Sequence, residues 1–255
     1  MKLELIVLVV CVALATGQDW CNIASCAPNA HVACNHDGNF HQDCRRPAAV
    51  TLTAANIQSI LDRHNNFRSL TAVGHTLGRD GNLPTAVRMA QLRWDPTLAH
   101  LAGLNVRRCL VRQDNCRNTE QFNAVGQNVG TMFFLGNMPA DIIINTVTDA
   151  WFDERRLTLQ SDIASVVTGR LFDMGRFANA VNERQTHVGC AISMFDQDSG
   201  STLWRVGLLA CNYASTNFGG TPIYRSGPVG SQCELGTDGT FPGLCTLNEP
   251  INPNV

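Results

Sequence analysis

The residues of this chain whose types and spacing could do covalent chemistry are its cysteines. Of the 11 cysteines, Cys11 falls in an N-terminal segment with the features of a cleaved leader. An even number remains, which predicts five disulfides formed in an oxidising compartment. Zinc ligation is the competing interpretation, but the sequence has no Cys-x-x-Cys pair and no finger-like Cys/His cluster. The remaining cysteines are Cys21, Cys26, Cys34, Cys44, Cys109, Cys116, Cys190, Cys211, Cys233 and Cys245.

An apolar segment at the N-terminus predicts export. Lys2 precedes the apolar run Leu5–Leu14, and Ala15-Thr16-Gly17 supplies the small residues of a cleavage site. This pattern is typical of a secretory signal peptide over residues 1–17, so we expect the mature chain to begin at Gln18. A membrane anchor is the alternative, but a bilayer span needs about 20 apolar residues and no segment supplies them. We therefore expect a soluble, extracellular protein without a membrane span.

Histidines are the other residues that could bind metal or transfer protons. His31, His36 and His41 recur at a spacing that fits no helix face, and the cysteines around them are expected to be bridged. A metal site there is only weakly indicated. His64 could be a catalytic base or a hydrogen-bonded helix residue near the core, and we favour the second role. Without a Gly-x-Ser-x-Gly motif or a free thiol, no catalytic nucleophile is indicated.

The charge balance excludes nucleic acid as a partner. The formal net charge is -2, and no run of basic residues is longer than a pair. The basic patch that binding to phosphates requires is therefore missing from the sequence. Lys2 is the only lysine, so every basic side chain of the predicted mature chain is Arg. This bias would suit an alkaline lumen, where Lys loses its charge before Arg, but we favour compositional drift as the explanation.

Helices predicted from the sequence must position most of the cysteines and histidines described above. A first helix is predicted after Thr53, whose hydroxyl can cap it. A second helix begins after Asp95-Pro96, where the carboxylate caps and the proline suits the first turn. A third helix follows Pro139, and a shorter helical pattern covers Arg176–Arg184.

Strand signals gather in the last third of the chain. Val188–Phe195 and Thr202–Cys211 are rich in apolar and β-branched residues, and 197–200 between them is a turn signal. Cys190 and Cys211 lie where they could face each other across this hairpin. Helices followed by a compact sheet predict a layered α+β domain.

Several motifs, taken in order along the chain, resemble those of the CAP superfamily, which comprises cysteine-rich secretory proteins, antigen 5 and pathogenesis-related proteins. The N-terminal cysteines, with His31-Val32-Ala33-Cys34, resemble insect antigen 5-related secreted proteins in particular. The resemblance covers nearly the whole predicted mature chain. The other motifs are His64-Asn65-Asn66-Phe67-Arg68, Leu92-Arg93-Trp94-Asp95-Pro96-Thr97-Leu98-Ala99, Cys116-Arg117 with Val125-Gly126-Gln127-Asn128-Val129, His187-Val188-Gly189-Cys190-Ala191 and Leu209-Ala210-Cys211-Asn212-Tyr213.

The resemblance implies a three-layer α-β-α sandwich of the α+β class. The implied organisation is a signal peptide over 1–17, a Cys-rich N-terminal extension over 18–50, a CAP domain over 51–218, and a Gly/Pro-rich C-terminal tail with one disulfide loop over 219–255. Carried over by position, the family's bridges would be Cys21–Cys34, Cys26–Cys116, Cys44–Cys109 and Cys190–Cys211, which leaves Cys233–Cys245.

The same resemblance implies a metal site whose ligands have been replaced. The family's central cleft typically holds two histidines and two acidic residues, which can bind a divalent metal. Here Gln113 and Arg176 stand at the histidine positions, Gln127 stands at the first acidic position, and only the acid Glu154 remains. Arg offers no lone pair and Gln is a poor zinc ligand. We predict no metal, no cofactor and no catalytic residue, and we hypothesise that Arg176 pairs with Glu154.

These departures favour a secreted, non-enzymatic and monomeric binding protein or extracellular effector. Family members that carry sterols or fatty acids make a small hydrophobic ligand the expected partner. Met132, Phe133 and Phe134 could line its pocket, although such a cluster is more often core. The alternatives are a degenerate-site hydrolase or protease, which the lost histidines disfavour, and a protein ligand of a receptor.

Overall fold

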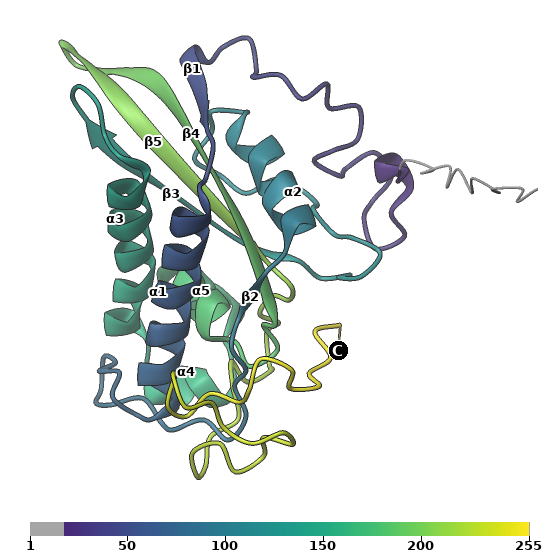
Figure 1. Ribbon diagram of the computed structural model, residues 1–255, viewed down its shortest axis with the longest axis vertical. Coiled ribbons are helices and arrows are strands. Elements are labelled where there is room, and N and C mark those ends of the chain that lie inside the picture. The colour runs from purple at the N-terminus through teal and green to yellow at the C-terminus, as the bar shows by residue number, and fades with distance from the viewer. Residues whose placement is uncertain (1–17, 255) are drawn as a thin grey trace, which may run out of the picture.

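A five-stranded sheet forms the middle layer of the protein (Figure 1). The computed structural model describes residues 18–254, so the predicted signal peptide lies outside the described residues. The strand order is β1-β4-β5-β3, with antiparallel neighbours, and the short β2 runs parallel to β4. The strands are β1 (Arg45–Val50), β2 (Arg93–Trp94), β3 (Gly126–Phe134), β4 (His187–Ser199) and β5 (Thr202–Tyr213).

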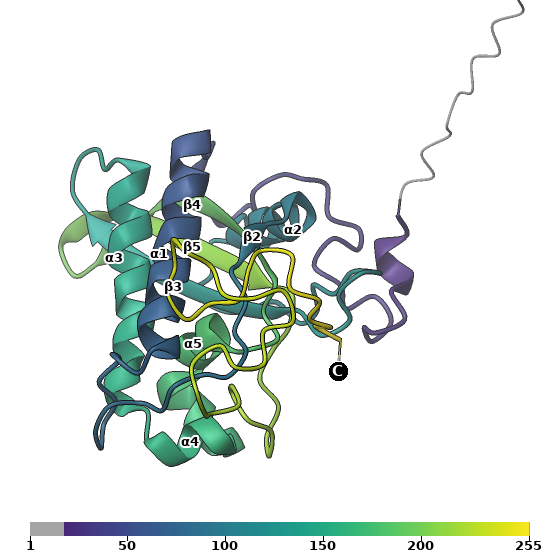
Figure 2. The same cartoon turned by 60° about the horizontal axis from the view of Figure 1, so that its bottom comes forward.

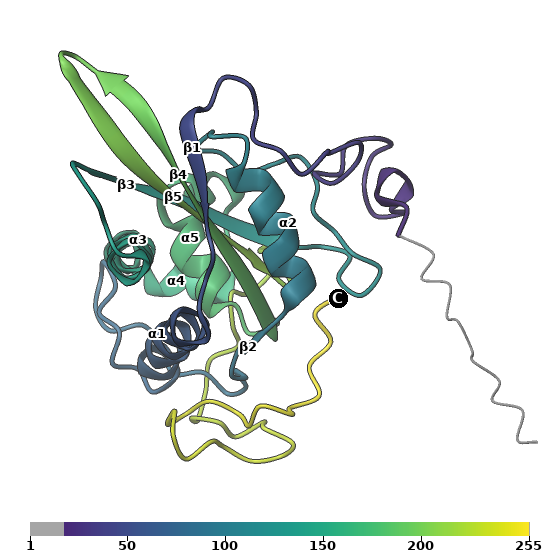
Figure 3. The ribbon, with the colours of Figure 1, turned by 45° about the horizontal axis from the view of Figure 1, so that its top comes forward.

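Helices cover both faces of this sheet. Figure 3 shows α2 (Pro96–Val106) on one face and α1 (Ala54–Ala72), α3 (Ala140–Asp153) and α5 (Leu171–Val181) on the other. The arrangement confirms the predicted three-layer α-β-α sandwich. Apolar side chains pack on both faces of the central strands, which is why β4 and β5 read as nearly continuous apolar runs. Shorter helical elements are α4 (Gln160–Ala164) and the 3-10 turns η1 (Trp20–Asn22), η2 (Glu154–Leu157) and η3 (Thr168–Arg170).

The predicted starts of the first three helices are confirmed. The Thr53 hydroxyl accepts a hydrogen bond from the Asn56 N–H at 3.2 Å and caps α1. The Asp95 carboxylate accepts one from the Leu98 N–H at 2.7 Å and caps α2. Each oxygen satisfies an N–H that has no partner within its own helix. Pro139 directly precedes α3, where a fixed φ suits the entry to a helix.

Two predicted boundaries are wrong. The short helix predicted over Arg176–Arg184 is α5, which begins at Leu171 and ends at Val181. Its apolar stripe runs from Met174 to Val181, and Asn182 has extended backbone that ends the helix. The turn predicted over 197–200 is also too long, because pairing continues to Ser199 opposite Thr202. A two-residue hairpin loop matches the strand twist, so the ladder extends to its last possible pair.

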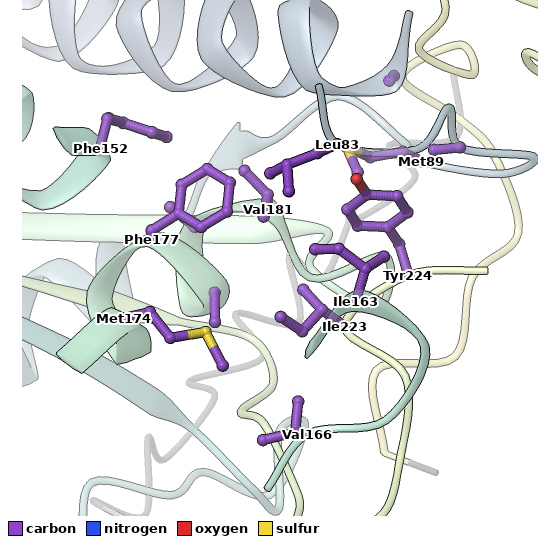
Figure 4. Close-up of a cluster of buried hydrophobic side chains, with 14 of the residues drawn as sticks. Leu83, Met89, Phe152, Ile163, Val166, Met174, Phe177, Val181, Ile223 and Tyr224 are labelled. Carbon is purple, nitrogen blue, oxygen red and sulfur yellow. The ribbon is translucent and has the colours of Figure 1, made fainter. Parts of the chain in front are cut away.

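The C-terminal tail contributes to the core. Ile223, Tyr224 and Leu244 are buried in one apolar cluster with side chains of α4 and α5 (Figure 4). The tail also runs along the C-terminal half of α1 (Figure 2), where the Ser69 hydroxyl donates to the Pro242 carbonyl at 2.6 Å. The tail therefore helps to hold α1 and α5 in place.

Residues 18–254 contain five disulfides, paired as the family resemblance implies. Three of them tie the N-terminal extension to itself and to the sandwich, one joins β4 to β5, and one closes a loop in the tail. In the hairpin, Cys190 and Cys211 lie directly opposite each other in the ladder. The bridges are Cys21–Cys34, Cys26–Cys116, Cys44–Cys109, Cys190–Cys211 and Cys233–Cys245.

Candidate functional site

A cleft of about 540 Å³ opens beside β3 and α5. Its lining brings together all four positions of the degenerate site that the sequence predicted: Gln113, Gln127, Glu154 and Arg176. These residues are far apart in the chain, and the sheet and α5 bring them together. The full lining is Val111, Arg112, Gln113, Gln127, Asn128, Val129, Glu154, Thr168, Leu171, Phe172, Gly175, Arg176, Asn179, Thr216 and Asn217.

The hypothesised ion pair is present in this cleft. The Arg176 Nε bonds to Glu154 Oε1, and the Arg176 and Phe177 backbone N–H groups donate to Glu154 Oε2 at 2.8 and 3.1 Å. The Glu154 side chain is 8% exposed, whereas that of Arg176 is 50% exposed. The buried carboxylate thus holds the backbone of α5 as well as its arginine.

Gln127 is fully occupied by hydrogen bonds beneath the cleft. Its Nε2 donates to Asp114 Oδ2 and to Asn212 Oδ1, both at 2.8 Å, and its Oε1 accepts from the Asp114 N–H at 3.2 Å. Gln113 donates to the Gln127 carbonyl at 2.6 Å. An amide can donate and accept together, so Gln127 joins these groups in a way that a carboxylate would not.

A hydrogen-bonded chain leads from the cleft into the core. Asn128 Nδ2 donates to the Arg176 carbonyl at 2.9 Å and to the Tyr213 hydroxyl at 3.2 Å. The Tyr213 hydroxyl lies 2.9 Å from His64 Nε2, and His64 Nδ1 lies 2.8 Å from the Ile60 carbonyl. Since a carbonyl only accepts, Nδ1 carries the proton and Nε2 accepts from the tyrosine.

Burial keeps His64 neutral. The side chain has no exposed surface, and desolvation lowers its pKa to about 4. Burial also raises the pKa of Tyr213, which keeps the phenol protonated as a donor. The hydrogen-bonded core role that we favoured for His64 matches this geometry, since both ring nitrogens are used and no substrate can reach them.

The cleft-facing side of α5 carries a residue that the sequence did not single out. Phe172, Arg176 and Asn179 are spaced four and three apart, so they share one helix face, and all three line the cleft. Phe172 is 91% exposed. In the sequence, Phe172 could have been found as an aromatic residue that lies outside the apolar stripe formed by Met174, Phe177 and Val181.

The cleft does not fit a divalent metal. Its lining contains no histidine, and its one carboxylate, Glu154, already accepts three hydrogen bonds that include the Arg176 guanidinium. A cation there would meet a permanent positive charge and neutral amides. Among residues 18–254, no group of three His, Cys, Asp or Glu side chains could hold a metal ion.

The predicted pocket residues lie elsewhere and on two faces of β3. Met132 and Phe134 pack with α3 side chains such as Ile143 and Val147. Phe133, between them, is 45% exposed, because successive strand residues point to opposite faces. None of the three lines the central cleft or the cavity described next.

A second cavity of about 400 Å³ lies at the C-terminal ends of α1 and α3. Phe67 stacks on Phe152 at its base, with ring centroids 3.9 Å apart, and Phe177 comes from α5. Figure 4 shows Phe152 and Phe177 near each other in the apolar cluster. Basic side chains complete the lining, which consists of Phe67, Leu70, Thr71, His75, Thr76, Leu77, Gly78, Phe152, Arg155, Arg156 and Phe177.

The N-terminal histidines have local structural roles. His31 Nε2 lies 2.8 Å from the Asn118 carbonyl, and its ring stacks on Trp20 with centroids 4.8 Å apart. His36 and His41 accept hydrogen bonds from nearby backbone N–H groups through their Nδ1 atoms. These contacts shape the turns of the extension.

The fold, the cysteine framework and the cleft define a family. The model of the cysteine-rich secretory protein (CAP) family matches residues 61–213, and the chain belongs to this family. Venom allergen-1 of Aedes albopictus is 34% identical over 236 residues, which cover 91% of this chain and 89% of that relative. The antigen 5 like allergen Cul n 1 of Culicoides nubeculosus is 32% identical over 205 residues, which cover 75% of this chain and 90% of that relative.

Solved structures share the fold. The crystal structure of NaASP2 with Zn²⁺ superposes on this protein with a TM-score of 0.63 at 21% sequence identity. The superposition covers 81% of this chain and 100% of the NaASP2 chain. In the part of this chain that the structure describes, no helix is long and apolar enough to cross a membrane.

Proposed function

We propose that this chain is a secreted, non-enzymatic binding protein for a small amphipathic ligand, a fatty acid. The observation that carries the proposal is the second cavity, which combines an aromatic base with cationic side chains at its edge. Binding sites for such ligands are mostly apolar, with a few polar groups that orient the ligand. The site proposed here therefore replaces the Met132–Phe134 cluster as the position of the ligand.

The apolar part of the cavity suits a hydrocarbon tail. Phe67, Phe152 and Phe177 come from three different elements and line the cavity, where Phe152 and Phe177 are buried members of the core, and Leu70 and Leu77 are also lining residues. Leu70 and Leu77 are exposed, so a bound chain would cover apolar surface that now faces water. Each methylene that it buries would contribute about 0.8 kcal/mol.

The charged part suits a carboxylate. Arg155 and Arg156 both line the cavity and share one acidic partner, Asp153, at 3.2 and 3.4 Å. Two guanidinium groups against one carboxylate leave a net positive charge, and the Arg156 side chain is 67% exposed. A fatty acid would meet this charge with its head group, whereas a sterol would not.

Catalysis has little support from the geometry. His64 is sealed in the core with both nitrogens bonded, and Glu154 is engaged by three donors. A general base needs reach to a substrate proton. Secretion is supported by the signal-like N-terminus and by five disulfides, which persist in oxidising compartments.

Native mass spectrometry with lipid extraction on the secreted protein is the direct test. We expect one equivalent of a long-chain fatty acid and no zinc in the same sample. The delipidated protein should then bind oleate in a calorimetric titration. A sterol without fatty acid, or no uptake of oleate, would contradict the proposal, and stoichiometric zinc would contradict the reading of the central cleft.

A matched pair of variants localises the site. Leu70→Glu places a carboxylate in the apolar lining and should weaken oleate binding by at least about tenfold, because the charge loses water and repels the head group. Leu135→Glu makes the same change at an exposed leucine outside this cavity and should bind like the parent. Equal binding by both variants would place the ligand elsewhere.

A further inference from the structure

The rim of the central cleft is apolar, although its floor is polar. Phe172 stands 91% exposed at this rim, and Val111 is an exposed lining residue. Val167 and Phe218 are also exposed and adjoin the lining residues Thr168 and Asn217 in the chain. Exposed apolar side chains gathered around a hollow are typical of interaction sites.

The segments that carry this rim are held together. The Gly220 N–H donates to the Val166 carbonyl at 2.8 Å, which places the segment after Asn217 against the one that precedes η3. α5 is held from below, because Glu154 binds its backbone and Asn128 binds the Arg176 carbonyl. The rim is thus supported by hydrogen bonds before any partner arrives, which lowers the entropic cost of binding.

The charge that the cleft offers is positive. Arg112 and Arg176 line it, and the single acidic lining residue, Glu154, is buried and accepts three hydrogen bonds. The guanidinium of Arg176 is half-exposed. A ligand that enters the cleft therefore meets two guanidinium groups and amide donors, a set that recognises a carboxylate.

We propose that the central cleft docks a peptide segment of a partner protein, with an acidic side chain toward Arg176 and a neighbouring aromatic or aliphatic side chain against Phe172. Phe172 and Val111 line the cleft and are exposed, so a bound segment can contact apolar side chains as well as Arg176. An aromatic and an arginine side by side are the residue types that dominate binding energy at protein interfaces. This inference is independent of the fatty-acid cavity.

Selection from a random peptide library displayed on phage provides the probe. The secreted protein is immobilised, and the Phe172→Ser protein is kept in excess in solution to remove peptides that bind other surfaces. We expect the enriched peptides to share an acidic residue next to an aromatic or aliphatic one. The absence of enrichment, or enriched sequences without acidic residues, would overturn the proposal.

Anisotropy titrations with one enriched peptide measure the roles of the two residues. Phe172→Ser and Arg176→Gln should each weaken binding by at least about tenfold, and so should amidation of the peptide's acidic side chain. Phe133→Ser and Arg79→Gln are matched exposed controls and should change little. Equal losses in the controls would refute the assignment of the cleft.

Two other occupants are distinguished by further measurements. A concentration-dependent dimer in sedimentation, lost in Phe172→Ser, would assign the rim to a second copy of this chain and overturn the proposal. Saturation of the cleft by free phenylacetate, with no displacement by the peptide, would assign it to a small acid instead. The Phe172→Ser protein should bind oleate like the parent, because Phe172 does not line the fatty-acid cavity. The peptide-binding test is therefore independent of the fatty-acid proposal.

Discussion

The polar side chains of the cleft satisfy one another. Gln127 links Asp114 and Asn212, and Glu154 holds both the side chain and the backbone of Arg176. The residue type at each of these positions therefore has a structural consequence, because each side chain has its own hydrogen-bonding needs. The residues act as supports of β3 and α5 as well as lining of the cleft.

Glu154 and Arg176 should differ in their importance for stability. Glu154→Ala removes three hydrogen bonds to a buried carboxylate, two of them from the N–H groups of Arg176 and Phe177, and should lower the free energy of unfolding by about 2–3 kcal/mol. Arg176→Ala removes a half-exposed, solvent-screened partner and should cost below about 1 kcal/mol. Urea unfolding of both variants measures the difference, and a larger loss for Arg176→Ala would contradict this interpretation.

His64 should make stability depend on pH. Its folded-state pKa is lowered from 6.5 to about 4, so between these values the unfolded chain binds the proton more readily. The stabilising contribution is complete above about pH 6.5 and is lost as the pH falls toward 4, amounting to about 3 kcal/mol. Urea unfolding at several pH values should show a shallower acid-side loss for His64→Gln than for the parent. If the free energy of unfolding fell with pH in parallel for His64→Gln and the parent, this role of His64 would be disproved.

At the scale of elements, one buried arginine joins its own helix, α1, to three other segments. Arg68 of α1 is fully buried and donates to the carbonyls of Ala90, Ala180, Asn182 and Gln185 over 2.8–3.3 Å. These carbonyls belong to the segment before β2, to the end of α5 and to the loop that leads into β4. The planar guanidinium fork reaches all of them at once.

Arg68→Lys should therefore destabilise the fold. Lysine keeps the charge but offers one ammonium in place of the fork, so some of the carbonyls lose their donor. We expect a loss of about 2–4 kcal/mol in the free energy of unfolding. Arg79→Lys, at an exposed position, is the control and should stay within about 0.5 kcal/mol of the parent. Similar values for the two variants would argue against the role of the fork.

At the scale of the whole molecule, disulfides tie the N-terminal extension to the sandwich and close a loop in the tail. The Cys26–Cys116 bridge joins the N-terminal extension to the segment before β3 and spans a sequence separation of 90. Cys233–Cys245 closes a tail loop with a separation of 12, and this loop packs against the segment that precedes β2. The bridges thus reinforce a sandwich that already has its own core.

The two bridges should differ in stabilising effect according to loop length. Because Cys44–Cys109 stays intact, Cys26–Cys116 closes a loop of only about 25 residues, 18 from Cys26 to Cys44 and 7 from Cys109 to Cys116. Replacing both cysteines of Cys26–Cys116 by serine should therefore cost about 3.5 kcal/mol, and the same change at Cys233–Cys245 about 3 kcal/mol, because a longer loop gains more entropy when released. Thermal unfolding of the two double variants under oxidising conditions tests the order. The reverse order would show that local packing of the tail outweighs chain entropy.

Local signals in the sequence were sufficient for part of the fold. Thr53 and Asp95 predicted helix starts because a capping side chain acts within three residues of itself. The boundary of α5 was not predictable to the same degree, since Phe172 and Arg176 interrupt the apolar pattern where they turn toward the cleft. The family motifs predicted the disulfide pairs and the four residues that meet in one cleft, Gln113, Gln127, Glu154 and Arg176.

The sequence alone determined the cysteine-rich framework, the capped helices and the residue types at the four cleft positions, because these depend on residue type and short spacing. Only the tertiary structure decided where Met132, Phe133 and Phe134 lie and which side chains bond to Gln127. It also decided that Phe67, Phe152 and Phe177 line one cavity together with Arg155 and Arg156. Those contacts join residues far apart in the chain, and they follow from how the helices pack on the sheet, which no local pattern specifies.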